Sequence, residues 1–247
     1  MSAAAMTPYL RLELRRTLRN PRAILLTSVI PVMMYILFST STSPGDDPLE
    51  VRRAVLASMV AYGAIGGALL ASGPPLAAER ATGWLRQLAA TPLPSNAAVI
   101  AKIAVCLTLA ACGSAIVAVV GAADGAELGV VTIVELVVAM TLGATAFGML
   151  GLCFGAAVKR PDTAQGATIL TYLTLSALGG LWVPPDQFPD WLAKLSSVLP
   201  SHLLLDVGRA IVLGDHLMIT AVLGLLAWTI GLAALARVAW QRGIRVR

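Results

Sequence analysis

The chain has 247 residues, of which 57% are hydrophobic and only 13% are charged, and its formal net charge is +5. Soluble domains carry about a quarter charged residues, so this composition excludes an ordinary soluble domain and favours an integral membrane protein. The long apolar runs are continuous and do not alternate, which favours an all-α membrane protein over a β-barrel.

The first predicted element, residues 7–22, is an amphipathic helix that lies in the lipid headgroup plane. It has an apolar face and a neighbouring basic face, formed by Leu10, Leu14 and Leu18 and by Arg11, Arg15, Arg19 and Arg22. This pattern is typical of interfacial helices, whose arginines meet anionic lipid. The alternative interpretation is a generic basic flank before the first span.

Six apolar windows follow, each close to the roughly 20 residues that a helix needs to cross the hydrocarbon core. They cover residues 23–40, 54–76, 98–121, 130–158, 164–183 and 217–236. The first window is too long for the apolar region of a cleavable secretory signal, so we expect it to be a span. Pro31 lies near its middle and should bend it.

The charges of the connecting segments predict the orientation. Six spans place both termini on one side, and that side carries 14 of the 18 lysines and arginines. The positive-inside rule therefore predicts cytoplasmic termini for a multi-pass protein of the bacterial plasma membrane. Because the positive charge belongs to a membrane face, it gives no basis for nucleic-acid binding.

The segment between the second and third windows is predicted to form a separate cytoplasmic helix over residues 79–90. It displays large apolar side chains, Trp84, Leu85 and Leu88, beside Arg80 and Arg86. Apolar groups that face water within a ring of charges indicate a docking surface.

Two short outer helices are predicted within residues 188–213, divided by Pro200. They are too short to span the membrane, so we expect them to be re-entrant or to lie at the outer interface. Asp206 and Arg209 are three residues apart and could pair on the second of them. The pair either lowers the cost of burying polar groups or contacts what is transported.

The sequence contains no recognisable nucleotide-binding or catalytic motif. No lysine follows a glycine-rich phosphate-binding loop, and neither HExxH nor GxSxG occurs. Cys106, Cys112 and Cys153 fall inside predicted spans without metal-site spacing, and Glu135 lies near a span end, where it can reach the headgroups or contact a proton or substrate. We expect no catalytic residue, no metal and no cofactor bound by this chain.

The stretch from Glu79 to Lys102 resembles the ABC-2 type permease family, whose second and third spans are joined by a similar segment. The matching residues are Glu79, Arg80, Gly83, Leu88, Thr91, Pro92, Leu93 and Lys102. The late outer segment is similar at Pro200, Arg209 and Gly214, but it has Ser201-His202 where the family commonly has an aromatic residue.

This resemblance implies a connecting N-terminal helix, six spans, a coupling helix and two outer helices. It implies a pair of permeases, two identical copies or this chain with a paralogue, bound to two copies of a separate ABC ATPase subunit that holds ATP and Mg. The coupling residues implied are Glu79, Arg80, Gly83, Trp84, Leu85, Leu88, Leu10, Leu14 and Arg15.

The family resemblance also implies export. An aromatic content of only 5% favours a drug, antibiotic or lipid-like amphiphile over a sugar polymer. Candidate residues of the translocation path are Thr168, Thr171, Tyr172, Asp206 and Arg209. The alternatives are a six-span membrane enzyme, such as an intramembrane protease or phospholipid synthase, and a membrane-anchored assembly or immunity factor.

Overall fold

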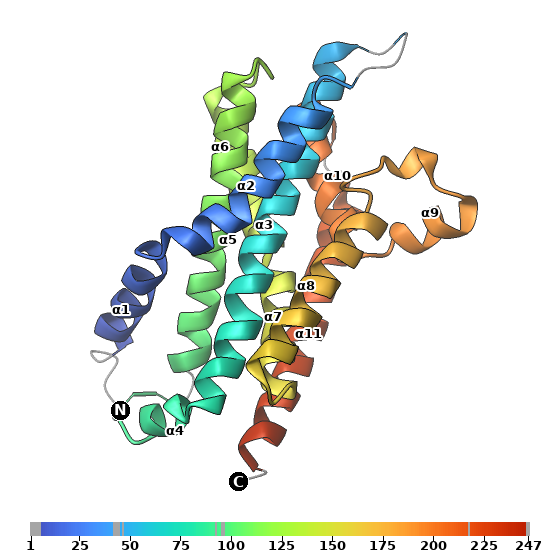
Figure 1. Ribbon diagram of the computed structural model, residues 1–247. Coiled ribbons are helices and arrows are strands. Elements are labelled where there is room, and N and C mark those ends of the chain that lie inside the picture. The colour runs from blue at the N-terminus through green and yellow to red at the C-terminus, as the bar shows by residue number, and fades with distance from the viewer. Residues whose placement is uncertain are drawn as a thin grey trace.

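The computed structural model describes residues 6–41, 45, 47–91, 93–94, 97–216 and 218–245, and these residues form helices and no strand. The expected all-α fold is confirmed for this part of the chain (Figure 1). The elements in chain order are α1 (Met6–Leu18), α2 (Pro21–Phe38), α3 (Pro48–Ala81), α4 (Trp84–Ala89), α5 (Ala97–Ala123), α6 (Val130–Gly143), α7 (Thr145–Ala157), α8 (Pro161–Leu178), η2 (Pro185–Gln187), α9 (Asp190–Ser196), α10 (Pro200–Leu213) and α11 (Ile219–Arg245).

The central helix of the bundle is α3, which has 34 residues and is almost completely buried from Leu56 to Ala77. Its first turn follows Asp47, whose carboxylate accepts a hydrogen bond from the Leu49 amide at 2.9 Å. A Cβ atom on Gly67 would lie 2.5 Å from the Leu109 carbonyl oxygen of α5. Glycine is therefore required at that position, because it lets α3 and α5 approach closely.

Within the described residues, four helical segments are long and apolar enough to cross a membrane. They are Pro48–Ala81, Ala97–Ala123, Val130–Ala157 and Ile219–Gln241. The pair α9 and α10, bent by 82°, would be a fifth if it counts as one broken span. The chain is thus a multi-pass membrane protein, and the number of six spans stays a prediction.

The two remaining windows correspond to α2 and α8, which have 18 residues each. In α2, the apolar part covers only Thr27–Phe38, which is shorter than the four segments above. The first turns of α8 carry polar residues such as Asp162 and Gln165, which lower its hydropathy. The predicted window 130–158 forms two helices, α6 and α7, which meet at Ala144.

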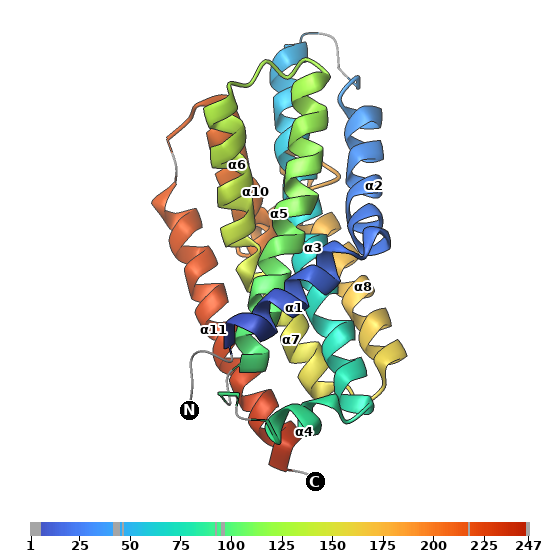
Figure 2. The same ribbon diagram turned by 90° about the vertical axis from the view of Figure 1, so that its left-hand side faces the viewer.

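Different helices lie at the two ends of the bundle. Figure 2 shows α4 and the end of α11 at one end, called here the α4 end, with the start of α6 at the opposite end. Helix α1 crosses the outside of α5 and contacts it (Figure 2). Three elements thus lie toward the α4 end of the bundle. They are α1, α4 and the last turns of α11.

Candidate functional site

The segment predicted as one helix over residues 79–90 is divided in the structure. Helix α3 continues to Ala81, and the separate helix α4 covers only Trp84–Ala89. Gly83 forms the turn between them with φ of 75°, a left-handed conformation that suits glycine because it has no Cβ. Glu79 and Arg80 therefore lie on the last turn of α3, and not on the short helix where the sequence placed them.

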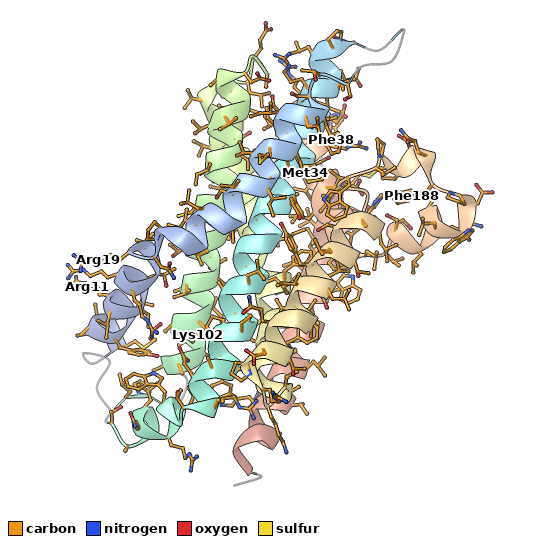
Figure 3. All side chains as sticks on the ribbon, viewed as in Figure 1. Arg11, Arg19, Met34, Phe38, Lys102 and Phe188 are labelled. Atoms are coloured by element: carbon orange, nitrogen blue, oxygen red, sulfur yellow. The ribbon has the colours of Figure 1, made fainter. Side chains whose placement is uncertain are left out.

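Glu79 is buried in a cluster of three charged residues. The Lys102 ammonium of α5 pairs with the Glu79 carboxylate of α3, and it lies 3.7 Å from the Glu13 carboxylate of α1. The side chains of Lys102, Glu13 and Glu79 are only 4%, 8% and 12% exposed. Figure 3 shows Lys102 near the α4 end, where these helices meet. The cluster joins three helices, and each carboxylate depends on the same lysine for its counter-charge.

Tyr9 lies beside this cluster. Burial raises the pKa of its hydroxyl to about 12, and the neighbouring carboxylates of Glu13 and Glu79 contribute in the same direction. Its hydroxyl and the Oε2 atom of Glu79 are buried with no hydrogen-bond partner among the described residues. Tyr9 therefore stays protonated and holds a hydrogen that it can donate.

Arg80 ties α3 to α7. Its guanidinium donates to the Gly155 carbonyl at 2.9 Å and also to the Ala156 carbonyl, at the C-terminal end of α7. These carbonyls lack partners inside their own helix, so the arginine caps the helix end. The sequence placed Arg80 on the displayed face of the coupling helix, whereas its side chain is used for this contact inside the bundle.

Helix α4 is held from two sides and exposed on a third. Leu85 packs against a cluster that includes Leu76 of α3, and Trp240 of α11 packs against the same cluster. Leu88 packs against Tyr9 of α1 with Ala97 and Ala101 of α5. Trp84 is 38% exposed, and Arg86 and Gln87 are also exposed. We call Trp84, Arg86 and Gln87 the α4 face.

Only part of the apolar stripe predicted on α1 packs against the bundle. Leu10 packs with the Tyr9 cluster and Leu14 packs against the main core, whereas Leu18 is exposed. Arg15 is exposed beside them, and Figure 3 shows Arg11 and Arg19 extending away from the bundle. The side chain of Arg22 lies outside the described residues, as does Pro92 of the resemblance motif.

The candidate path residues of α8 are packed against α3. The Thr168 hydroxyl donates to the Ala164 carbonyl at 2.7 Å and is fully buried. The Tyr172 hydroxyl donates to the Tyr62 carbonyl at 3.0 Å, and the two tyrosine rings stack with centroids 4.6 Å apart. Thr171 is half-buried. Thr168 and Tyr172 therefore fill a helix contact in this conformation.

The other two candidates lie on α10, and their expected ion pair is absent among the described residues. The Asp206 carboxylate instead lies 3.6 Å from the Nε2 atom of His202, one helical turn earlier. The Nε atom of Arg209 is buried and has no hydrogen-bond partner among the described residues. The Nδ1 atom of His202 is 3.1 Å from the Ser196 hydroxyl. Asp206 lines a groove against α11 that includes no residue of α8. The five proposed path residues are thus divided between two places.

Sequence reasoning gave no site role to Glu13, Lys102, Tyr9 or His202. Lys102 carried a signal, because an ionisable residue in a predicted span is rarely without a function or a partner. His202 carried another, because it stands four residues before Asp206, the spacing of neighbours on one helix face.

Two comparisons with known proteins bear on this chain. The family model described as "ABC-2 family transporter protein" matches residues 38–238. The chain is also similar to the Bacillus subtilis protein named "Putative transport permease YvfS", with 24% identity over 200 residues that cover 77% of this chain and 78% of that protein. The family match includes α3, α4 and the start of α5, the region in which the sequence resemblance was seen.

Proposed function

This chain belongs to the ABC-2 transporter family and is a transport permease subunit, and we propose that it exports an amphiphilic small molecule. In this proposal a separate ABC ATPase subunit binds ATP and Mg and docks on the α4 face. The observation that carries the proposal is the geometry of α4, a short helix that exposes Trp84 and Arg86 while its other faces are packed on the bundle.

The contacts of α4 supply a route for movement. A displacement of α4 reaches the Tyr9 cluster of α1 and α5 through Leu88, and it reaches the Leu76 cluster of α3 and α7 through Leu85. It also reaches the last turn of α3 directly, through the turn at Gly83. The buried cluster around Lys102 and the Arg80 contacts then keep α1, α3, α5 and α7 together. Closure of the ATPase subunits would therefore move these helices as one unit.

The proposal includes a second permease copy or a paralogue, and a surrounding lipid bilayer. Helix α2 exposes large apolar side chains, among them Val29, Met33 and Leu37. Surface of this kind needs to be covered by lipid or by another permease. We place the α4 end in the cytoplasm of a bacterial plasma membrane, because the exposed arginines of α1 and α4 lie at that end.

The test is a pair of tryptophan variants, measured in the complex with the copurifying ABC ATPase subunit. Trp84→Ala should weaken docking about tenfold or more and abolish amphiphile-stimulated ATP hydrolysis, because buried interface tryptophans commonly contribute about 2 kcal/mol or more. Trp191→Ala is the control, since Trp191 is 67% exposed on α9, away from α4. The proposal fails if Trp84→Ala retains both docking and stimulation.

One observation bears on the alternative of a membrane hydrolase. Ser196, His202 and Asp206 form a chain of polar contacts that is superficially similar to a catalytic triad. Ser196 is completely buried, so its hydroxyl cannot meet a substrate in this conformation. A fluorophosphonate probe, which labels activated serines, should leave Ser196 unmodified. Labelling at Ser196 that disappears in His202→Ala would favour the enzyme over the permease.

A further inference from the structure

A groove runs between α11 and the corner formed by α9 and α10. Its volume is about 780 Å³ and it is open along one side. This volume lies in the range of small-molecule sites, which are mostly apolar with a few polar groups that fix orientation. The residues that line it come from α10, α11 and the Ser197–Val198 corner.

The two walls of the groove differ in polarity. The α10 wall carries His202 and Asp206, whereas the α11 wall is mostly apolar and extends to Leu232 and Leu235. The Trp228 indole donates to the Val198 carbonyl at 2.9 Å, which fixes α11 against the corner. Leu232 and Leu235 lie one and two turns beyond Trp228, so the groove continues past the corner toward the α4 end.

The α11 wall is hollow at Gly231. A Cβ atom built on Gly231 would meet no atom within 4 Å, whereas one built on Gly224 would lie 2.6 Å from the Leu203 side chain. Leu203 therefore fills the groove near Gly224, and the space beside Gly231 is open. An apolar group can therefore lie beside Gly231 without a clash at that position.

The charge in the groove selects among amphiphiles. The Asp206 side chain is 31% exposed, and its one ion-pair contact among the described residues is His202 at 3.6 Å. No lysine or arginine of the described residues lies within 4 Å of its carboxylate. A partly exposed carboxylate in such a groove favours a cation, because it attracts positive charge. The same carboxylate repels an anionic headgroup.

We propose that this groove binds a cationic amphiphile, with its ammonium group at Asp206 and its apolar body along the α11 wall, past Trp228 to Gly231, Leu232 and Leu235. The inference deepens the proposed function, on which it rests for its place in transport, because it names the substrate class and the site. It also separates Asp206 from Thr168 and Tyr172, which fill the contact between α8 and α3.

The test uses the full chain without the ATPase subunit, in micelles of a nonionic detergent. The probe is dodecylamine with a diazirine in its alkyl chain, and the matched probe is dodecanol with the same diazirine. After irradiation, mass spectrometry measures labelling of residues 219–241. We expect saturable labelling by the amine that exceeds labelling by the alcohol about tenfold, since a cation close to a partly exposed carboxylate gains about that much.

Three variants locate the site. Asp206→Asn should lower amine labelling about tenfold to the level of the alcohol, whereas Asp215→Asn, the same change at an exposed residue outside the groove, should leave it unchanged. Gly231→Leu should block both probes, because its side chain fills the open space. Equal labelling by amine and alcohol, or unchanged labelling in Asp206→Asn, would overturn the inference.

The two proposals fail separately. Labelling of the groove without any effect of the amine on ATP hydrolysis by the complex would leave the site standing and remove its role in transport. Stimulated hydrolysis with labelling elsewhere in the chain would leave the transport proposal standing and overturn the groove assignment. Thermal unfolding of each variant shows whether lost labelling reflects a lost fold.

Discussion

Charged residues serve different purposes in the α4 end and in the α10–α11 groove. Near α4, Lys102 is 4% exposed and holds two carboxylates from two other helices. In the groove, Asp206 is 31% exposed, has a histidine as its partner and faces open volume. A buried charge that loses its partner is costly, whereas an exposed one is not. Substitutions of the buried charges near α4 should therefore change stability, and substitution of the groove carboxylate should change binding.

The largest effect is expected for Lys102→Met. This change leaves Glu13 and Glu79 buried without their shared counter-charge, so the free energy of unfolding should fall by about 3–5 kcal/mol. Unfolding in mixed detergent micelles measures it. Lys159→Met, at an exposed lysine, is the control and should change little. If the two variants unfold alike, Lys102 does not hold the helices together.

A double variant sharpens this prediction. Adding Glu79→Gln to Lys102→Met removes one of the two unpaired carboxylates, so the double variant should be more stable than Lys102→Met alone. The comparison measures the coupling between the two side chains directly. Simple addition of two independent losses would contradict the buried cluster.

A smaller effect is expected for Arg80→Met, which keeps the apolar stem and removes the donors to Gly155 and Ala156. Hydrogen bonds to charged groups contribute about 1.5–3 kcal/mol, so the loss of stability should be of that order. Hydrogen exchange at the end of α7 should rise in the same variant. Arg86→Met, on the exposed α4 face, should leave stability and exchange unchanged while it weakens docking of the ATPase subunit.

Among the substitutions of the charged residues in the two regions, the smallest effect on stability is expected for Asp206→Asn, within about 1 kcal/mol, because the carboxylate is partly exposed and its one ion-pair partner is a histidine at 3.6 Å. The same variant should lose most of its preference for a cationic amphiphile over a neutral one. A large loss of stability in Asp206→Asn would show that this carboxylate supports the fold, and the contrast between the two regions would disappear.

Much of the bundle could be predicted from the sequence, because continuous apolar runs determine where helices cross a membrane. The exposure of Trp84 was predicted from its place beside charged residues in the segment after the second window, and the even number of predicted spans between them placed the first helix on the same side as that segment. The roles of Glu79 and Arg80 could not be predicted, because each depends on a partner distant in sequence. Glu79 pairs with Lys102, 23 residues away, and Arg80 contacts carbonyls 75 and 76 residues away.

The groove between α10 and α11 could be predicted from the sequence only in part, for a different reason. The four-residue spacing of His202 and Asp206 can be recognised in the sequence. The open volume beside Gly231 cannot, because it depends on the distance between α10 and α11, which no local sequence pattern determines. Periodicity predicted that Asp206 and Arg209 share one face of a helix. It could not predict which neighbour the carboxylate would meet once the α9–α10 corner was formed.

The central claim is that a separate ATPase subunit docks on α4. The most direct measurement places a photoreactive amino acid at Gln87, which is exposed on the α4 face, and irradiates cells that contain both subunits. A crosslink to the ATPase subunit from position 87, and none from position 191 on α9, is the result expected. A crosslink from position 191 with none from position 87 would contradict it.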